Sequence, residues 1–224
     1  AGRRPCDNRH AMTPSRIRDR LIAQRVVPVL RLASAELTER AVDCLVQAGF
    51  TTVEITMTTP GAVALIDRLA RRLEPRFLVG AGTVLDLDAA RHCLGAGARF
   101  LVSPCAVPGM AAAAHAAGCA ALIGGFPPGE ILVAHREGAE VVKVFPASTG
   151  GPEHVRAIHA VFPDILLCPT GGVSLDNLDA YFAAGAALVG VGNNIIDQPA
   201  LAAGDDARAI AHARRFLQRD SASA

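Results

Sequence analysis

The chain has 224 residues, a length that suits one domain of the size of an α/β barrel. Hydrophobic residues make up 51% of it and aromatic residues only 4%, which predicts a large core of aliphatic side chains. The formal net charge of +1 argues against the basic surface that nucleic-acid binding requires, and the chain lacks the run of about 18 apolar residues that a membrane helix needs.

The first residues are polar and rich in arginine, and no apolar stretch follows Arg3 and Arg4 as it would in a signal peptide. We expect residues 1–13 to be a disordered extension or an expression remnant, residues 14–219 to form one barrel domain, and residues 220–224 to be a tail. The six cysteines form no C-x-x-C pair, which favours a reducing, cytoplasmic location. No Cys/His cluster has the spacing of zinc ligands, so we expect no metal site.

Eight short runs of apolar, often β-branched residues recur along the chain, and each is followed by an Ala- and Leu-rich stretch typical of an amphipathic helix. The runs are Val26–Leu30, Thr52–Thr56, Phe77–Gly80, Phe100–Ser103, Ala120–Ile123, Val141–Val144, Ile165–Pro169 and Ala187–Val191. Continuous apolar strands that alternate with helices indicate a parallel sheet buried on both faces. With a further helix at about residues 14–24 closing the bottom, they predict a (β/α)8 TIM barrel. An open, doubly wound sheet is the alternative, but no G-x-G-x-x-G motif follows the first strand.

Residue types that favour helix ends lie between the predicted strands. Glycines that can cap a helix C-terminus precede five of the strands, namely Gly49, Gly97, Gly118, Gly138 and Gly185. Helix N-termini are expected at Ser34, the Thr59-Pro60 pair, Asp86 and Ser174.

Lys143 is the only lysine in the chain, since the other 21 of the 22 basic residues are arginines, and it lies within the predicted sixth strand. A desolvated lysine, unlike an arginine, can lose its proton and act as a nucleophile. The alternative is a structural lysine whose charged end reaches solvent from the end of the strand. We favour amine chemistry, most simply a Schiff base with a carbonyl substrate.

Glu54 is the candidate partner of this amine. The reactive groups of a barrel lie at the C-terminal ends of its strands, and the predicted second strand carries a glutamate, a residue type that strands disfavour. Schiff-base chemistry requires proton transfers, so we expect Glu54 to be a general acid and base. The alternative is that Glu54 only forms an ion pair with an arginine.

Glycine-rich turns follow the predicted seventh and eighth strands, at Pro169–Gly172 and Gly190–Asn193. Exposed backbone N–H groups in such turns, together with the Thr170 hydroxyl, suit a carboxylate or a phosphate. Tight turns between strands and helices need glycine in any case, so each turn alone is weak evidence. Two of them at adjacent strands predict an anion site.

Several short motifs occur in the order and with the spacing of one protein family. They are V-E-I-T around Glu54, G-A-G-T-V-L at 80–85, S-P at 103–104, K-V-F-P at 143–146, C-P-T-G-G-V at 168–173 and G-V-G at 190–192. Over about residues 20–215 the chain resembles the 2-keto-3-deoxy-6-phosphogluconate (KDPG) aldolases, a family that includes 2-keto-4-hydroxyglutarate (KHG) and 6-phosphogalactonate enzymes. The resemblance implies a (β/α)8 class I aldolase, usually a homotrimer, that acts on a small keto acid without a metal or other cofactor.

The resemblance also implies a reaction and a set of roles. The reaction is cleavage of KDPG to pyruvate and glyceraldehyde 3-phosphate, with 2-keto-3-deoxy-6-phosphogalactonate or 4-hydroxy-2-oxoglutarate as alternative substrates. Lys143 matches the Schiff-base lysine and Glu54 the general acid and base. The substrate-binding positions are Thr83, Pro104 and Phe145 for the pyruvyl pocket, Thr170 for the pyruvate carboxylate, and Gly171, Gly172 and Gly192 for the phosphate.

Three positions depart from the commoner pattern of the family. Thr58 stands where many members have arginine, Asn193 where serine is usual, and Gly124 where proline is expected. We expect Arg31, at the end of the first strand, to supply the missing cation, and Asn193 to donate a hydrogen bond to the substrate's anion. These departures do not touch the bond-cleaving groups, but they leave open which keto acid is bound and whether it must be phosphorylated.

Two other functions compete with the aldolase. A non-catalytic barrel that binds phosphate or sugar acids would have no reason to keep both Lys143 and Glu54. An isomerase or epimerase would need paired acids, or a metal with histidine ligands, and the predicted strand ends offer neither.

Overall fold

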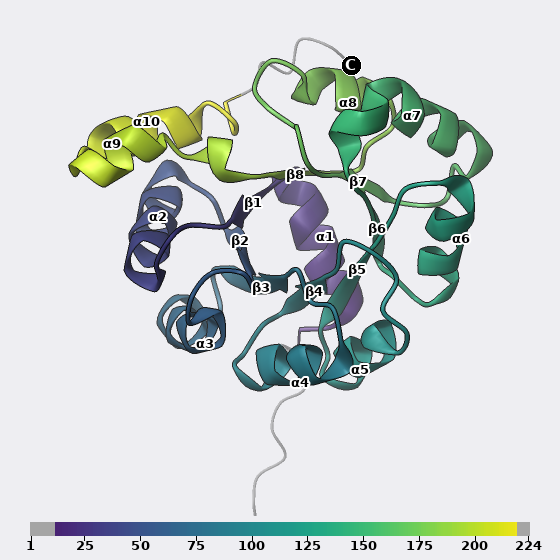
Figure 1. Cartoon of the computed structure of the whole chain (residues 1–224), viewed down its shortest axis with the longest axis horizontal. Helices are drawn as coiled ribbons and strands as arrows, with labels where there is room; N and C mark the ends of the chain where they lie inside the picture. Colours follow the sequence, from purple (N-terminus) through teal and green to yellow (C-terminus); the bar gives the residue numbers. More distant parts are fainter. Residues whose placement is uncertain (1–11, 219–224) are drawn as a thin grey trace, which may run out of the picture.

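Eight parallel strands form a ring in the order β7-β6-β5-β4-β3-β2-β1-β8 (Figure 1). Isolated bridges from Leu167 to Ala186 and from Thr170 to Gly190 join β7 to β8 and close the ring. The computed structural model describes residues 12–218, and it confirms the predicted TIM barrel. The predicted tail at 220–224 and all but the last two residues of the predicted extension at 1–13 lie outside the described residues.

Every residue of the eight strands is buried, as expected for a parallel sheet covered on both faces. The strands are β1 (Val26–Leu30), β2 (Thr52–Thr56), β3 (Leu78–Gly82), β4 (Phe100–Val102), β5 (Ala120–Gly125), β6 (Val141–Val144), β7 (Leu167–Pro169) and β8 (Val189–Val191). β1, β2 and β6 have the predicted bounds; β4, β5, β7 and β8 shift by one or two residues at one end, and β3 shifts at both ends.

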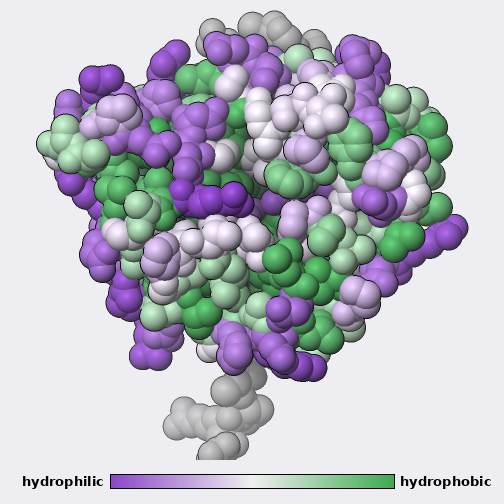
Figure 2. All heavy atoms as spheres, viewed as in Figure 1, coloured by the Kyte–Doolittle hydropathy of each residue, from purple (hydrophilic) through white to green (hydrophobic). Residues whose placement is uncertain are grey.

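Helices surround the ring, and the first of them lies across its bottom (Figure 1). They are α1 (Pro14–Gln24), α2 (Ala35–Ala48), α3 (Ala62–Leu73), α4 (Leu87–Gly95), α5 (Met110–Ala116), α6 (Pro128–Arg136), α7 (Ala147–Val161), α8 (Leu178–Ala183), the 3-10 turn η2 (Asn193–Ile195), α9 (Gln198–Ala203) and α10 (Asp206–Arg214). The last two pack against α2. Within residues 12–218 no helix is long and apolar enough to span a membrane. Hydrophilic residues dominate the edge of the face shown in Figure 2.

The predicted helix starts at Ser34 and Asp86 are confirmed, because their side chains accept the N–H groups of Leu37 and Ala89. The Thr59-Pro60 pair lies just ahead of α3, which Gly61 caps.

The predicted helix start at Ser174 is confirmed by its hydrogen bonds, because the Ser174 hydroxyl accepts the Asp176 N–H at 3.3 Å and its carbonyl accepts the Leu178 N–H at 3.0 Å. The Asn177 side chain accepts the Ser174 N–H at 2.9 Å and donates to the Gly172 carbonyl at 2.8 Å. These bonds add to the turn at residues 175–177, which leads into the regular helix α8 at Leu178.

The inside of the barrel has an apolar floor and a polar mouth. Ile17 and Leu21 of α1, both fully buried, belong to the same cluster as the lower interior side chains of the strands. That cluster also contains Val27, Leu78, Phe100, Val102, Ala120, Leu122, Val141, Cys168 and Leu188. The predicted closure of the bottom by an N-terminal helix is confirmed, and the buried side chains of Glu54, Lys143 and Thr170 lie above this floor, toward the C-terminal ends of the strands.

Candidate active site

Lys143 lies on the interior face of β6, and only 5% of it is exposed. In the sheet register it stands opposite Gly124 of β5 and Cys168 of β7. One of these neighbours has no side chain and the other a small one. The lysine therefore has room to extend across the mouth of the barrel, and it does not reach bulk solvent as a snorkelling lysine would.

Glu54 of β2 faces this amine. Its Oε1 lies 3.8 Å from the Lys143 Nζ, a separation at which the two groups attract each other but do not form a hydrogen bond. No described residue hydrogen-bonds to this oxygen, although it is buried. Burial raises the pKa of the Glu54 carboxyl, and the positive charges of Lys143 and Arg31 oppose the rise. The carboxyl is thus a group that can hold a proton and has a free oxygen with which to pass it on.

Interior glycines make the space for this pair. A Cβ on Gly82 of β3 would overlap the Glu54 carboxylate, and a Cβ on Gly124 of β5 would overlap the Pro104 backbone. The glycine at 124, where the family's pattern predicts proline, therefore lets the β4–α5 loop close over the strand next to Lys143. Pro104, a predicted pocket residue, therefore lies against Gly124, which pairs with Lys143 in the sheet.

Two further predicted pocket residues approach the amine and the carboxylate. The Phe145 ring is partly exposed, and its centroid is 5.4 Å from the Lys143 Nζ. Thr83 follows β3 with a φ of +58°, a conformation that β-branched residues rarely adopt. Its hydroxyl accepts from an Arg31 guanidinium nitrogen at 3.5 Å, the long limit of a hydrogen bond. The Arg31 guanidinium therefore lies over the Glu54 side of the mouth.

Thr170 and the two following glycines form the β7 side of the mouth. Thr170 is 6% exposed, and its hydroxyl lies against the glycine at position 190 of β8. Gly171 and Gly172 have φ values of +89° and +84°, so this turn requires glycine. The carbonyls of Thr170 and Gly171 accept the N–H groups of Ala147 and Ser148 at the start of α7. These bonds fix the turn after β7 against the start of α7, the helix that follows Lys143's strand.

Gly192 and Asn193 follow β8, as predicted, but the Asn193 side chain is directed to β1. Its Oδ1 accepts the Arg31 N–H at 2.9 Å, and its Nδ2 donates to the Arg31 carbonyl at 2.6 Å. Thr58, the other departure, shares a hydrogen bond with Thr56 at 2.9 Å at the end of β2. The structure thus brings all of the predicted site residues to one end of the barrel.

Cys168 is a site residue that the sequence analysis missed. It neighbours Lys143 in the sheet register and is buried within the barrel, where desolvation raises the pKa of its thiol to about 11. It therefore stays a neutral thiol beside the amine. A strict alternation of inward and outward positions along β7, counted back from Thr170, was the signal that could have placed it inside.

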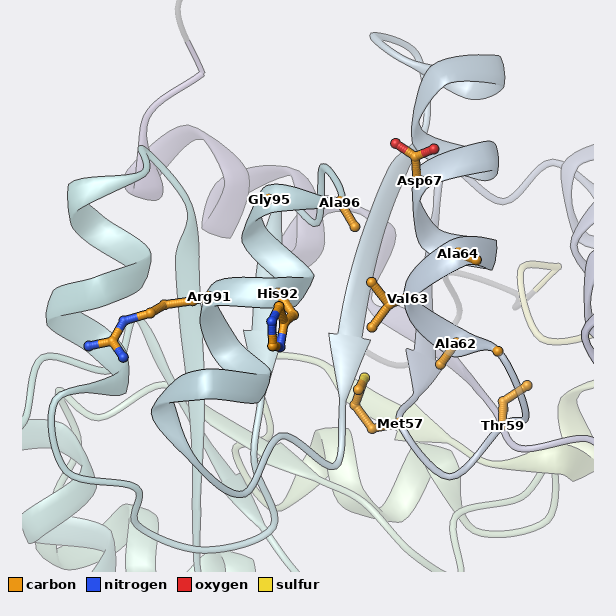
Figure 3. Close-up of a pocket in the computed structure, with 11 residues that line it drawn as sticks. Met57, Thr59, Ala62, Val63, Ala64, Asp67, Arg91, His92, Gly95 and Ala96 are labelled. Atoms are coloured by element: carbon orange, nitrogen blue, oxygen red, sulfur yellow. The ribbon is translucent and has the colours of Figure 1, made fainter.

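A separate groove of about 840 Å³ lies on the outside of the barrel (Figure 3). Its walls come from α3 and α4, with Val63, Met57 and His92 near the middle and Asp67 at one end. Asp67 pairs with Arg71 at 2.9 Å, and neither Lys143 nor Glu54 lines the groove. The groove is therefore separate from the barrel mouth that carries the candidate residues.

Comparison with known proteins decides the family. The family model for KDPG and KHG aldolase matches residues 17–212. The chain belongs to this aldolase family. It is 36% identical over 181 residues to a probable 2-dehydro-3-deoxy-6-phosphogalactonate aldolase of Rhizobium meliloti, covering 80% of this chain and 85% of that protein. It is 35% identical over 197 residues to the 2-dehydro-3-deoxy-phosphogluconate aldolase of Pseudomonas aeruginosa, covering 87% and 89%.

A solved structure agrees with these relatives. The KDPG aldolase of Legionella pneumophila, crystallised with pyruvate captured as a covalent carbinolamine, superposes with a TM-score of 0.81 at 27% identity. The match covers 89% of this chain and 97% of that one. Membership of the aldolase family makes the chain an enzyme, a carbon–carbon lyase.

Proposed function

We propose that this aldolase cleaves a 2-keto-3-deoxy-6-phospho sugar acid to pyruvate and an aldehyde through a Schiff base on Lys143. The observation that carries the proposal is the buried pair of amine and carboxylate, 3.8 Å apart at the barrel mouth. A binding protein would gain nothing from burying two ionisable groups that do not hydrogen-bond to each other, because their desolvation costs stability.

In the proposed mechanism the Lys143 amine adds to the C2 ketone and gives a carbinolamine, which loses water to form an iminium ion. The C4 hydroxyl then loses its proton, the C3–C4 bond breaks, and its electron pair moves toward the iminium nitrogen. The aldehyde leaves and an enamine remains. Protonation at C3 and addition of water then release pyruvate and restore the free amine.

Each of these steps moves a proton, and Glu54 is the group placed to move it. It can accept the proton that the amine loses before attack, and return it when water leaves the carbinolamine. Burial raises the pKa of its carboxyl above the ordinary value, which favours the protonated form relative to an exposed carboxylate. The thiol at Cys168 stays protonated and takes no part.

The two ends of the substrate bind to different groups at the mouth. The pyruvyl carboxylate binds the Thr170 hydroxyl and the Arg31 guanidinium, and the contact of Arg31 with Thr83, a predicted residue of the pyruvyl pocket, supports this role for the cation. The left-handed glycines Gly171 and Gly172, with Gly192 after β8, bind the phosphate through backbone N–H groups.

KDPG is the first choice of substrate, with glyceraldehyde 3-phosphate as the aldehyde. The C4 epimer derived from galactonate is the second, because the R. meliloti relative is named for it. Cleavage rates on these two phosphorylated acids and on 4-hydroxy-2-oxoglutarate, with pyruvate as the measured product, distinguish the candidates. Activity on none of them would overturn the proposed function.

Borohydride trapping tests the mechanism directly. Reduction of the protein with pyruvate should add one pyruvyl unit to the peptide that carries Lys143, the only side-chain amine of the chain, as read by mass spectrometry. The Lys143→Arg variant keeps the charge but cannot form the adduct, and should show neither label nor cleavage. An adduct solely at the N-terminal amine would contradict the mechanism.

We also propose that the chain works as a cytoplasmic homotrimer. Support comes from the family resemblance, from the five unpaired cysteines within the described residues, and from a structural neighbour, a cage designed by fusing symmetric oligomeric domains. Light scattering should give three times the chain mass of 23.2 kDa. A mass of one chain would contradict the trimer without affecting the proposed chemistry.

A further inference from the structure

The turn after β8 carries two consecutive asparagines whose side chains go to opposite neighbours. Asn194 donates to the Val173 carbonyl in the loop after β7 at 2.9 Å. The Asn193 side chain points the other way, toward β1, and both ends of its amide bond to backbone atoms of Arg31. The pair therefore ties the last strand of the barrel to both of its neighbours beyond the points where the strands end.

The bonds from Asn193 imitate a strand partner. Arg31 is the first residue after β1, where the ladder to β8 has ended. One acceptor and one donor on the Asn193 amide satisfy the N–H and the C=O of this residue, as the backbone of a neighbouring strand would. Because both the N–H and the C=O of Arg31 are bonded to Asn193, the Arg31 backbone is fixed, and so is the direction of its Cα–Cβ bond.

The Arg31 side chain has little else to hold it. It is exposed, and its long bond to the Thr83 hydroxyl is the contact that orients the guanidinium. A flexible arginine must lose rotamer freedom when it binds an anion, so a fixed starting point at its Cα makes that binding more favourable.

We propose that Asn193 is a positioning residue: it fixes Arg31 over the pyruvyl pocket and does not itself contact the substrate. The role rests on the proposed function, since it concerns the cation that binds the keto acid. It replaces our expectation from sequence that Asn193 donates to the substrate's anion, because both polar ends of the amide are directed to the Arg31 backbone and bond to it. Asn193, the residue after G-V-G, thus positions the Arg31 cation and does not bind the substrate itself.

A double-mutant cycle of Asn193→Ala and Arg31→Ala tests the proposal. Asn193→Ala should raise KM for the keto acid and lower kcat/KM about five- to twentyfold, with kcat little changed, because it loosens binding and leaves the reacting groups in place. In the Arg31→Ala background the same substitution should have no further effect. Losses that multiply in the double variant would show that Asn193 acts independently of Arg31 and would overturn the proposal.

Two more variants sharpen the cycle. Asn193→Asp keeps an acceptor for the Arg31 N–H but sets a carboxylate oxygen against the Arg31 carbonyl, so it should behave like Asn193→Ala; wild-type kinetics in this variant would contradict the two-ended clamp. Gln198→Ala is the matched control, since Gln198 donates only to the Asn193 backbone carbonyl, at 3.5 Å. Its kcat/KM should equal that of the wild type.

Amide hydrogen exchange provides a readout that does not depend on catalysis. The Arg31 amide should exchange faster in Asn193→Ala than in the wild type, and at the wild-type rate in Gln198→Ala. Unchanged exchange in Asn193→Ala would show that the two bonds from Asn193 do not hold the Arg31 backbone, and would overturn the proposal whatever the kinetics show. A wild type that cleaves no keto acid but shows the expected exchange would overturn the proposed function while the clamp stands.

Discussion

Glu54 combines burial with an unoccupied oxygen, and both properties follow from a single strand position. It lies on the interior face of β2 beside a glycine of β3, so its Oε1 has room but receives no hydrogen bond from residues 12–218. Glu54→Gln should therefore lower kcat by about 10²–10⁴. The variant keeps Lys143 and should still form a borohydride adduct. A variant in which kcat holds and only KM rises would assign Glu54 to binding.

The raised pKa of Glu54 also predicts how stability depends on pH. Folding raises this pKa above its ordinary value of 4.5, so the folded chain holds the proton more tightly than the unfolded chain does. The free energy of unfolding should therefore fall as pH rises from about 4.5 through the raised pKa. Glu54→Gln is neutral throughout and lacks this loss, so the stability difference should move in its favour across that window.

Urea unfolding from about pH 4 to about pH 9 measures this difference. Glu153→Gln, at a side chain that is 82% exposed, is the matched control and should run parallel to the wild type. A constant difference between Glu54→Gln and the wild type at every pH would contradict the burial effect.

Gly82 tests whether the position of the carboxylate matters as much as its presence. Alanine there adds a methyl group that overlaps Glu54, so the carboxylate must move from the amine. A displacement of about 1 Å can cost about 10²-fold in rate, and we expect a loss of that order in kcat. Gly95→Ala in α4, where an added Cβ meets nothing within 4 Å, should leave kcat unchanged. Full activity in Gly82→Ala would show that the site tolerates a displaced Glu54.

At the scale of elements, α1 is part of the core. Leu21 is fully buried against the interior of the strands, so Leu21→Ala leaves a cavity in the floor. We expect a loss of about 2–5 kcal/mol in the free energy of unfolding, measured with denaturant. Arg16→Ala, exposed on the same helix, should stay within about 0.5 kcal/mol of the wild type. Equal effects of the two variants would mean that α1 does not stabilise the barrel.

Strand composition predicted the elements well but some of their ends poorly. The prediction began β3 at Phe77, whose N–H instead bonds to the Leu73 carbonyl in the last turn of α3. It also ended β3 at Gly80, whereas the ladder continues to Gly82 through residue types that strands disfavour. Here glycine is kept for the space it leaves inside the barrel, which strand propensity does not measure.

The sequence predicted the reactive residues of the candidate site but not the contacts that position its other groups. Lys143 and Glu54 stand out in the sequence because charged residues interrupt apolar strands. The bonds between Arg31 and Asn193 join residues 162 apart, beyond the ends of the paired strands β1 and β8, and no local pattern signals them. Residue types could therefore predict which groups react, while the orientation of the groups around them depended on the closed barrel.

At the scale of the whole molecule, the floor made by α1 leaves the barrel with one opening. Under the proposed mechanism the pyruvyl fragment is still covalently attached when the aldehyde forms, so the aldehyde must depart first through the mouth. In the condensation direction pyruvate must load before the aldehyde. Steady-state kinetics should then be ordered, with pyruvate as the last product released and as the competitive inhibitor of the cleaved substrate. Because α1 closes the other end of the barrel, the substrate must enter and both products must leave through this one mouth.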